Sequence, residues 1–195
     1  MVAVGVSGHK DLFDLEAVTD AIDEALREIL AAFGGNSLQV ISPLAEGADR
    51  VVAWRALANY SVRLVVPLPM ELSEYMLDFD SITSKSEFLT LLEQAEQVIE
   101  LPNAGTRELC YQAAGMYVLD HSDVLIAVWD GELARGTGGT AEIVTEARKR
   151  GMPLAWVQVA GRERESSYVK RNVAGGVRIH YERFPTQPDR EAGAS

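Results

Sequence analysis

Short apolar runs alternate with amphipathic segments along residues 2–68, and this alternation constrains the fold more than any other feature. The runs at 2–6, 38–44 and 63–68 are rich in β-branched residues and have the length of buried strands. Apolar residues recur at helical spacing over 14–33, which predicts a helix, and a second helix begins near Ala48. Strands that alternate with helices through short joints are typical of a parallel, doubly wound sheet. Because its crossovers are right-handed, the first three strands should lie in the order three, two, one.

The rest of the chain continues this pattern around an acidic helical insertion. Residues 71–100 contain eight acidic side chains and one lysine, Lys85. The periodicity predicts helices over 71–77, 84–95, 107–121 and 140–150, and strands over 98–101, 124–128, 154–159 and 177–182. We therefore expect an α/β protein with a Rossmann-like doubly wound, mainly parallel sheet and helices on both faces. A chain of 195 residues fits one such domain, which we assign to 1–184 with the insertion at 71–97, followed by a disordered tail at 185–195.

Composition argues against several function classes. The 29 acidic and 18 basic side chains give a formal net charge of −11, with no dense Lys/Arg run, so we expect no nucleic-acid partner. No apolar run approaches the roughly 20 residues that span a bilayer, and no signal-peptide pattern opens the chain. The single cysteine, Cys110, cannot form an internal disulfide, and three histidines show no metal-ligand spacing. These features predict a cytoplasmic protein without membrane contact, metal or cofactor.

A glycine-rich stretch, WDGELARGTGGTAE at 129–142, follows the most apolar predicted strand and opens a predicted helix. The first amides of a helix lack carbonyl partners, the helix dipole is positive at that end, and glycine lets the backbone approach a phosphate closely. The stretch therefore predicts a phosphate-binding turn. Its candidate residues are Gly136, Thr137, Gly138, Gly139 and Thr140. The alternative is that the glycines only join strand to helix; the Gly-Lys-Ser/Thr ending of a Walker loop is missing.

The turns after the first two strands supply further candidates. Ser7, Gly8, His9 and Lys10 follow the first strand, and Glu46 with Gly47 follows the second. Ligands of open parallel sheets bind beyond the carboxyl ends of the strands, so these turns should face the glycine stretch if strands 2–6 and 124–128 are neighbours. Glu46 would then bind ribose hydroxyls. The alternatives are a surface histidine and a solvated lysine.

Asp49 and Arg50 begin the helix after the second strand. The first-turn carboxylate complements the helix dipole, and we expect Arg50 to be solvated.

Carboxylates near the glycine stretch are the catalytic candidates if the protein is an enzyme. Glu142 lies two residues after Thr140 inside the predicted helix, and Asp130 follows strand 124–128 directly. Both have structural alternatives, namely helix-dipole complementarity for Glu142 and a turn cap for Asp130. Trp129 would stack a base or pack in the core.

The insertion offers a possible lid over the same edge of the sheet. Tyr75, Asp78 and Phe79 follow the third strand, and Arg107 begins a helix on the same side. These residues would orient a bound base. For Tyr75 and Phe79, four residues apart, anchoring of a helix to the core is the favoured alternative.

Three segments together resemble the SLOG superfamily, Rossmann-like domains related to the LOG-type nucleotide phosphoribohydrolases and the DprA/Smf proteins. They are SGHKDL at 7–12, SPLAEGADR at 42–50, and SDVLIAVWDG with GTGGTAE within 122–142. The resemblance covers roughly residues 1–160. It implies that the three turns form a site for a nucleotide or a nucleotide-derived ligand.

The chain departs from the LOG-type catalytic pattern. That pattern has its glutamate three residues after the threonine, where this chain has Ile143, and its arginine position aligns with Ala114 and Gly115. We therefore expect ligand binding, as a sensor or nucleotide-processing protein, ahead of hydrolysis or transfer at a nucleotide N-glycosidic bond. A protein-interaction module with an acidic interface is a further alternative.

The resemblance also implies a homodimer. The predicted helix at 107–121 offers a local reason, because apolar residues lie on more than one of its sides. The residues concerned are Leu109, Ala113, Ala114, Gly115, Met116 and Tyr117. The alternative is that this helix is buried between the sheet and the insertion.

Overall fold

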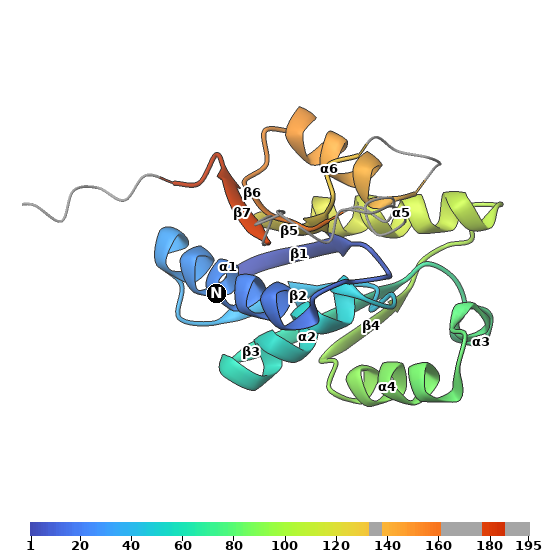
Figure 1. Cartoon of the computed structure of the whole chain (residues 1–195). Coiled ribbons are helices and arrows are strands. Elements are labelled where there is room, and N and C mark those ends of the chain that lie inside the picture. The colour runs from blue at the N-terminus through green and yellow to red at the C-terminus, as the bar shows by residue number, and fades with distance from the viewer. Residues whose placement is uncertain (133–137, 161–176, 186–195) are drawn as a thin grey trace, which may run out of the picture.

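A computed structural model of the protein describes residues 1–132, 138–160 and 177–185. Within these residues, seven strands form one sheet in the order β4-β3-β2-β1-β5-β6-β7 (Figure 1). The strands are β1 (Val2–Gly8), β2 (Leu38–Ile41), β3 (Val62–Leu68), β4 (Gln97–Glu100), β5 (Val124–Trp129), β6 (Leu154–Gln158) and β7 (Arg178–Glu182). All neighbours are parallel except β6 and β7. The predicted order of the first three strands is confirmed, and β4 lies at the sheet edge beside β3.

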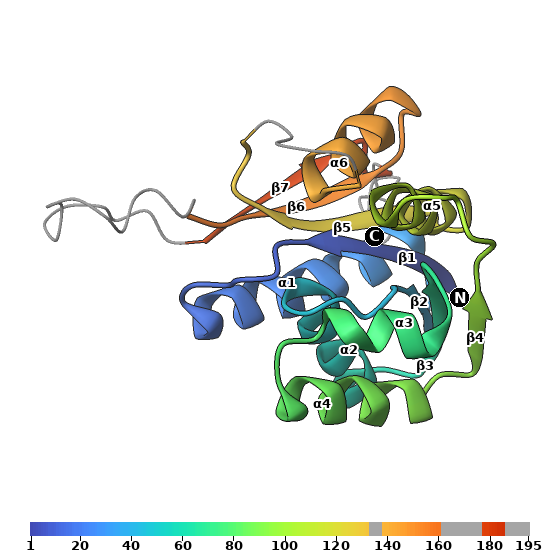
Figure 2. The same cartoon turned by 90° about the vertical axis from the view of Figure 1, so that its right-hand side faces the viewer.

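Helices cover both faces of the sheet, as the sequence predicted (Figure 2). They are α1 (Leu15–Phe33), α2 (Ala48–Asn59), α3 (Leu72–Tyr75), the 3-10 turn η1 (Met76–Asp78), α4 (Ile82–Glu93), α5 (Arg107–Asp120) and α6 (Thr140–Lys149). Strand β5 shows the two layers by alternation, because Ile126 belongs to the core with α1 and α2 whereas Leu125 belongs to the core with α5 and α6. The near-continuous burial of β5 follows from this double cover.

The predicted insertion folds as a helical arm between β3 and β4, and we call residues 71–95 the arm. It lies on the α1/α2 side of the sheet, where α4 is beside α2 (Figures 1 and 2). Tyr75, Phe79, Phe88 and Leu91 are buried in the same core as Leu68. The arm is therefore part of the packed structure on this face of the sheet.

Element ends differ from the sequence prediction where polar side chains cap the backbone. Strand β2 ends at Ile41, because the Ser42 hydroxyl accepts a hydrogen bond from the Leu44 amide at 3.0 Å and Leu44 turns to a φ of 58°. Helix α4 begins at Ile82, two residues early, because Ser81 caps it by accepting from the Ser84 amide. Within the described residues, no helix is both long enough and apolar enough to span a membrane. Residues 186–195 of the predicted tail lie outside the described residues.

Candidate functional site

Strands β1 and β5 bring the first turn and the start of the glycine stretch to one edge of the sheet. Ser7 pairs with Ala127 and Gly8 with Val128, and the His9 amide donates to the Val128 carbonyl at 2.9 Å. The predicted adjacency of these strands is thus confirmed. Crossovers run from β1 toward β2 and from β5 toward β6, so the chain winds in opposite directions from this pair. Their carboxyl ends form the switch point at which open α/β sheets bind ligands.

The His9 ring and Asp130 meet across this switch point. The Nε2 atom of His9 lies 3.2 Å from the Asp130 amide nitrogen and 3.2 Å from its Oδ1. The side chains are 34% and 13% exposed, so the ring can be reached from solvent. A neutral ring accepts from the amide through Nε2, and a protonated ring donates to the carboxylate. The ring and the carboxylate are therefore within hydrogen-bond reach of each other at the edge of the sheet.

Gly8 and Gly47 are required by the packing of the first two turns. A Cβ on Gly8 would lie 2.3 Å from the Ala48 Cβ, and one on Gly47 would lie 2.1 Å from the Lys10 carbonyl oxygen. Gly47 also has a φ of 86°, and the Ala48 amide donates to the His9 carbonyl at 3.0 Å. The two turns are fixed against each other, which positions the side chains that follow them.

The two described glycines of the phosphate-binding prediction differ in their surroundings. Gly136 and Thr137 lie outside the described residues. Gly138 has a φ of 81° and packs on α5, where a Cβ would come within 2.9 Å of the Glu108 carbonyl oxygen. Gly139 has an extended backbone with a φ of −86°, and a Cβ there would meet nothing within 4 Å. Gly139, directly before α6, is therefore the described residue of this turn that has open space beside it.

The Glu142 carboxylate connects this turn to α5, with one oxygen on each side. Its Oε2 accepts from the Gly138 amide at 2.6 Å, and its Oε1 accepts from the side-chain amide of Gln112. The helices approach closely here, since a Cβ on Gly115 would lie 2.3 Å from the Ile143 Cδ1. Gln112 was not a sequence candidate, because only the packing of α5 against α6 brings it to Glu142.

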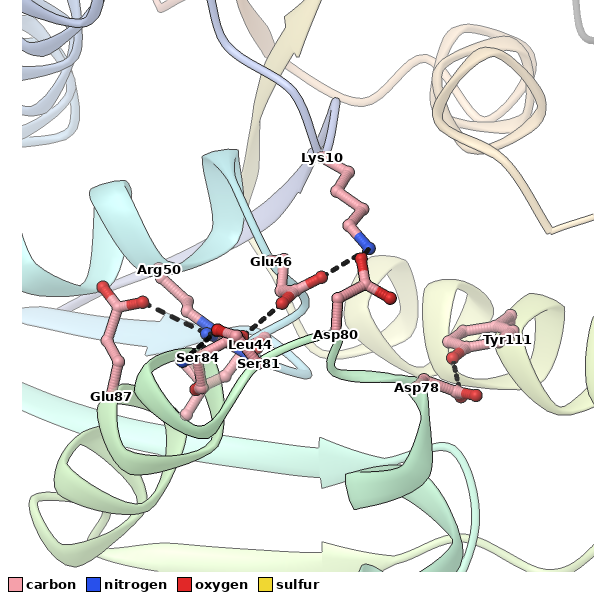
Figure 3. A network of polar contacts seen from close by, with 10 residues as sticks. All are labelled: Lys10, Leu44, Glu46, Arg50, Asp78, Asp80, Ser81, Ser84, Glu87 and Tyr111. Carbon is pink, nitrogen blue, oxygen red and sulfur yellow. Dashed lines mark hydrogen bonds and ion pairs between the residues drawn. The ribbon is translucent and has the colours of Figure 1, made fainter.

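A polar network joins the first two turns to the arm (Figure 3). The Lys10 ammonium lies 2.6 Å from both Glu46 Oε2 and Asp80 Oδ2. The other Glu46 oxygen accepts from the Ser84 hydroxyl. Hydrogen bonds to Asp80 and Glu46 raise the pKa of Lys10. Burial opposes ionisation of Glu46, but hydrogen bonds from Lys10 and Ser84 together leave its pKa below the ordinary value.

Arg50 and Asp49 are buried, so the expectation of a solvated Arg50 is wrong. The Arg50 Nε donates to the Leu44 carbonyl at 3.0 Å, and its Nη1 donates to the Ser84 carbonyl at 2.9 Å. Its guanidinium also stacks 4.5 Å from the Phe79 ring centroid. The arm folds over this side chain, a tertiary contact that local sequence does not reveal. In the described part of the chain, Arg50 Nη2 is one of three buried side-chain atoms without a hydrogen-bond partner.

The proposed lid residues fall into two groups. Tyr75 and Phe79 are 1% and 4% exposed and pack together at 5.0 Å between ring centroids, as expected for core anchors. Asp78 instead accepts from Arg107 Nε at 2.9 Å and from the Tyr111 hydroxyl, which fastens the arm to α5. Trp129 is also in the core, 6% exposed. Among the described residues, no group of three or more His, Cys, Asp or Glu side chains is placed to hold a metal ion.

Comparison with known proteins identifies a likeness in structure. No protein-family model and no curated protein matches the sequence. The fold is similar to the X-ray structure of DNA processing protein A (DprA) from Streptococcus pneumoniae, with a TM-score of 0.57 and 14% identity. The match covers 84% of this chain and 52% of that one, so the protein spans about half the length of its structural relative. The likeness confirms the Rossmann-like α/β fold that the sequence predicted.

Proposed function

We propose that the protein binds a nucleotide or a nucleotide-derived phosphorylated molecule at the carboxyl edge of β1 and β5. The observation that carries this proposal is the meeting of His9 and Asp130 at the switch point of the sheet. The two strands end side by side there, and the chain continues from β5 through the glycine stretch into α6. Parallel sheets of this type use the same place for ligands.

The groups at this edge suit an anion with attached hydroxyls. His9 is reachable and can donate to a phosphate oxygen when protonated. The start of α6 contributes its dipole and the open space beside Gly139. Glu46 remains the candidate for ribose hydroxyls, and its side chain is 15% exposed.

Binding to nucleic acid is the less favoured use of this fold. The structural relative is a DNA processing protein by its title, but the likeness concerns half of its length. A protein neutralises backbone phosphates with Lys and Arg, and this chain has a formal net charge of −11. A small phosphorylated ligand therefore fits the charge distribution better than a polynucleotide.

An enzyme acting on a nucleotide N-glycosidic bond is the second candidate. The His9–Asp130 pair favours the enzyme, because general acid–base catalysis requires a proton donor or acceptor within reach of the ligand. Between the two predicted catalytic carboxylates, Asp130 is the better placed. Both oxygens of Glu142 already hold the Gly138 turn and Gln112.

A ligand panel tests both candidates. Nucleoside mono- and diphosphates, sugar phosphates and a single-stranded oligonucleotide would be screened by thermal shift and confirmed by calorimetry. We expect a phosphorylated nucleotide to raise the melting temperature and His9→Gln to weaken its binding by roughly tenfold or more, as for loss of a charge-assisted hydrogen bond. His121→Gln, at the C-cap of α5 before the start of β5, is the matched control. Chromatography of the same mixtures would detect released base or sugar.

The outcomes separate the candidates. Binding without release supports a sensor, and release that Asp130→Asn abolishes supports the enzyme. If every nucleotide and sugar phosphate leaves the melting temperature unchanged, the proposal is wrong. An oligonucleotide as the sole binder would move the function to nucleic acid.

A further inference from the structure

The protein's own carboxylates occupy two of the groups predicted to hold the ligand's anion. Glu142 accepts from the Gly138 amide at 2.6 Å, and Asp80 lies 2.6 Å from the Lys10 ammonium. A ligand that uses either group must displace a carboxylate or bind beside it. The surroundings of the two carboxylates decide which one can leave.

Glu142 is held on both oxygens within packed structure, by the Gly138 amide and Gln112. Glu46, the other partner of Lys10, is 15% exposed and also accepts from Ser84. Loss of either would leave part-buried donors unpaired, which is costly. Asp80 differs, because its side chain is 80% exposed. An exposed ion pair contributes little to stability, because solvent takes over both charges when the pair opens.

The arm is fastened on both sides of Asp80, independently of Lys10. Before it in the chain, Asp78 is bound by Arg107 and Tyr111. After it, Ser84 is bound through its carbonyl and hydroxyl by the buried Arg50. Figure 3 shows Lys10 reaching from the first turn toward the segment between these two attachments. Asp80 can therefore leave Lys10 without release of the arm.

We propose that Lys10 is the cationic receptor for the ligand's phosphate and that Asp80 is an internal counter-ion which the phosphate displaces. This inference rests on the proposed function and adds Lys10 to the groups that hold its anion. Glu46 stays in place and orients the ammonium. The arm thereby sets the affinity of the site, because every incoming anion competes with one of its carboxylates. A doubly charged phosphate is favoured over a singly charged one, because the Lys10 ammonium attracts it more strongly than the single charge of the carboxylate that it displaces.

Sulfate is the probe, because it is a tetrahedral dianion. Its binding to four proteins would be measured by calorimetry at low ionic strength: the wild type, Asp80→Asn, Glu93→Gln and Lys10→Gln. The Glu93 change removes the same charge from an exposed position of the arm, in α4, and is the matched control. We expect Asp80→Asn to bind sulfate about fivefold more tightly, which corresponds to about 1 kcal/mol. Glu93→Gln should stay within about twofold of the wild type because its charge is screened. Lys10→Gln should lose most of the affinity.

Several results would overturn the inference. Equal tightening by Asp80→Asn and Glu93→Gln would mean a general charge effect, and unchanged affinity in Lys10→Gln would place the anion elsewhere. No tightening in Asp80→Asn would show that the carboxylate does not compete. If none of the four proteins binds sulfate, Lys10 is no anion receptor, and the nucleotide panel still decides the proposed function. Thermal unfolding of each variant checks that the fold is retained.

Discussion

At the scale of single residues, Asp49 shows how burial changes the chemistry of a common side chain. Asp49 is 4% exposed, and its carboxyl group accepts a hydrogen bond from the Ser42 hydroxyl at 2.8 Å. Burial raises its pKa to about 7, although the hydrogen bonds from Ser42 and the Ala45 backbone and the charge of Arg50 oppose the increase. The folded protein therefore keeps a proton on Asp49 that the unfolded chain releases near its ordinary pKa of 3.8.

This proton makes stability depend on pH in a stated direction. Below the unfolded pKa both states are protonated and Asp49 costs nothing. As the pH rises from about 4 to about 7, the unfolded state loses its proton first, so the free energy of unfolding falls. Asp49→Asn removes this dependence and should stabilise the protein above neutral pH by up to about 4 kcal/mol, from about three pKa units.

Urea unfolding at about pH 5 and about pH 8 measures the effect. The variant should gain on the wild type between the two values, whereas the exposed Glu93→Gln control should follow the wild type. An Asp49→Asn variant that is equally destabilised at both values would show that Asp49 is ionised in the fold throughout.

At this scale, the sequence does not reveal features that a tertiary contact decides. The sequence drew attention to Gly8 and Gly47, but the structure explains them by the close packing of two turns. Arg50 was expected in solvent and is buried under the arm. Neither its partner Ser84 nor the His9–Asp130 contact is visible along the chain, because each joins segments distant in sequence.

At the scale of elements, two adjacent glycines in the turn into α6 should have different roles, Gly139 in ligand binding and Gly138 in folding. A side chain on Gly139 meets nothing within 4 Å, and the backbone there is extended. Gly139→Val should therefore leave the fold nearly intact, with less than about 1 kcal/mol lost at this helix cap. It should abolish binding of the phosphorylated ligand, because the branched side chain fills the space beside the first amides of α6.

Gly138→Ala is the contrasting variant. Its φ of 81° and the 2.9 Å approach to the Glu108 carbonyl oxygen should cost about 1–3 kcal/mol of stability. Calorimetric titration and thermal unfolding of both variants make the comparison. Unchanged ligand affinity in Gly139→Val would reduce this turn to a connector.

The sequence predicted the type of each described helix and strand correctly, but the residues at which they begin and end less accurately. The periodicity placed every described strand and helix, because buried parallel strands and amphipathic helices leave distinct patterns. The ends depended on capping by Ser42 and Ser81, which the pattern of apolar residues does not record. In the arm, Tyr75 and Phe79 were lid candidates with core packing as the favoured alternative, and their rings pack together in the core.

At the scale of the whole molecule, the sheet order follows from the chain order and the handedness of crossovers. The first three strands took the expected order, and β5 joined β1 as the shared turns required. The position of β4 was not predictable, because the arm that precedes it has no regular crossover length. The switch point, and with it the candidate site, could therefore be located from sequence, but the contacts within it could not.

The last prediction concerns assembly, and the structure changes the argument for it. Ala114 is 1% exposed and Gly115 packs against Ile143 of the same chain, so these small residues already serve an intramolecular contact between α5 and α6. What remains for a partner is a stripe on α5 in which Leu109 is 40% exposed and Met116 and Tyr117 are half-buried. Apolar and aromatic residues of these types are typical of the core of a protein–protein interface.

We expect a homodimer that buries this stripe. Sedimentation velocity at micromolar concentration should show a dimer for the wild type and a monomer for Met116→Glu with Tyr117→Glu, because the paired carboxylates would meet their copies across a symmetric interface. Leu77→Glu with Ile82→Glu is the matched control. It adds the same charge at arm residues that are 74% and 88% exposed, and it should stay dimeric. A monomeric wild type would exclude the dimer. Loss of the dimer in the control alone would place the interface on the arm, since that change leaves the α5 stripe untouched.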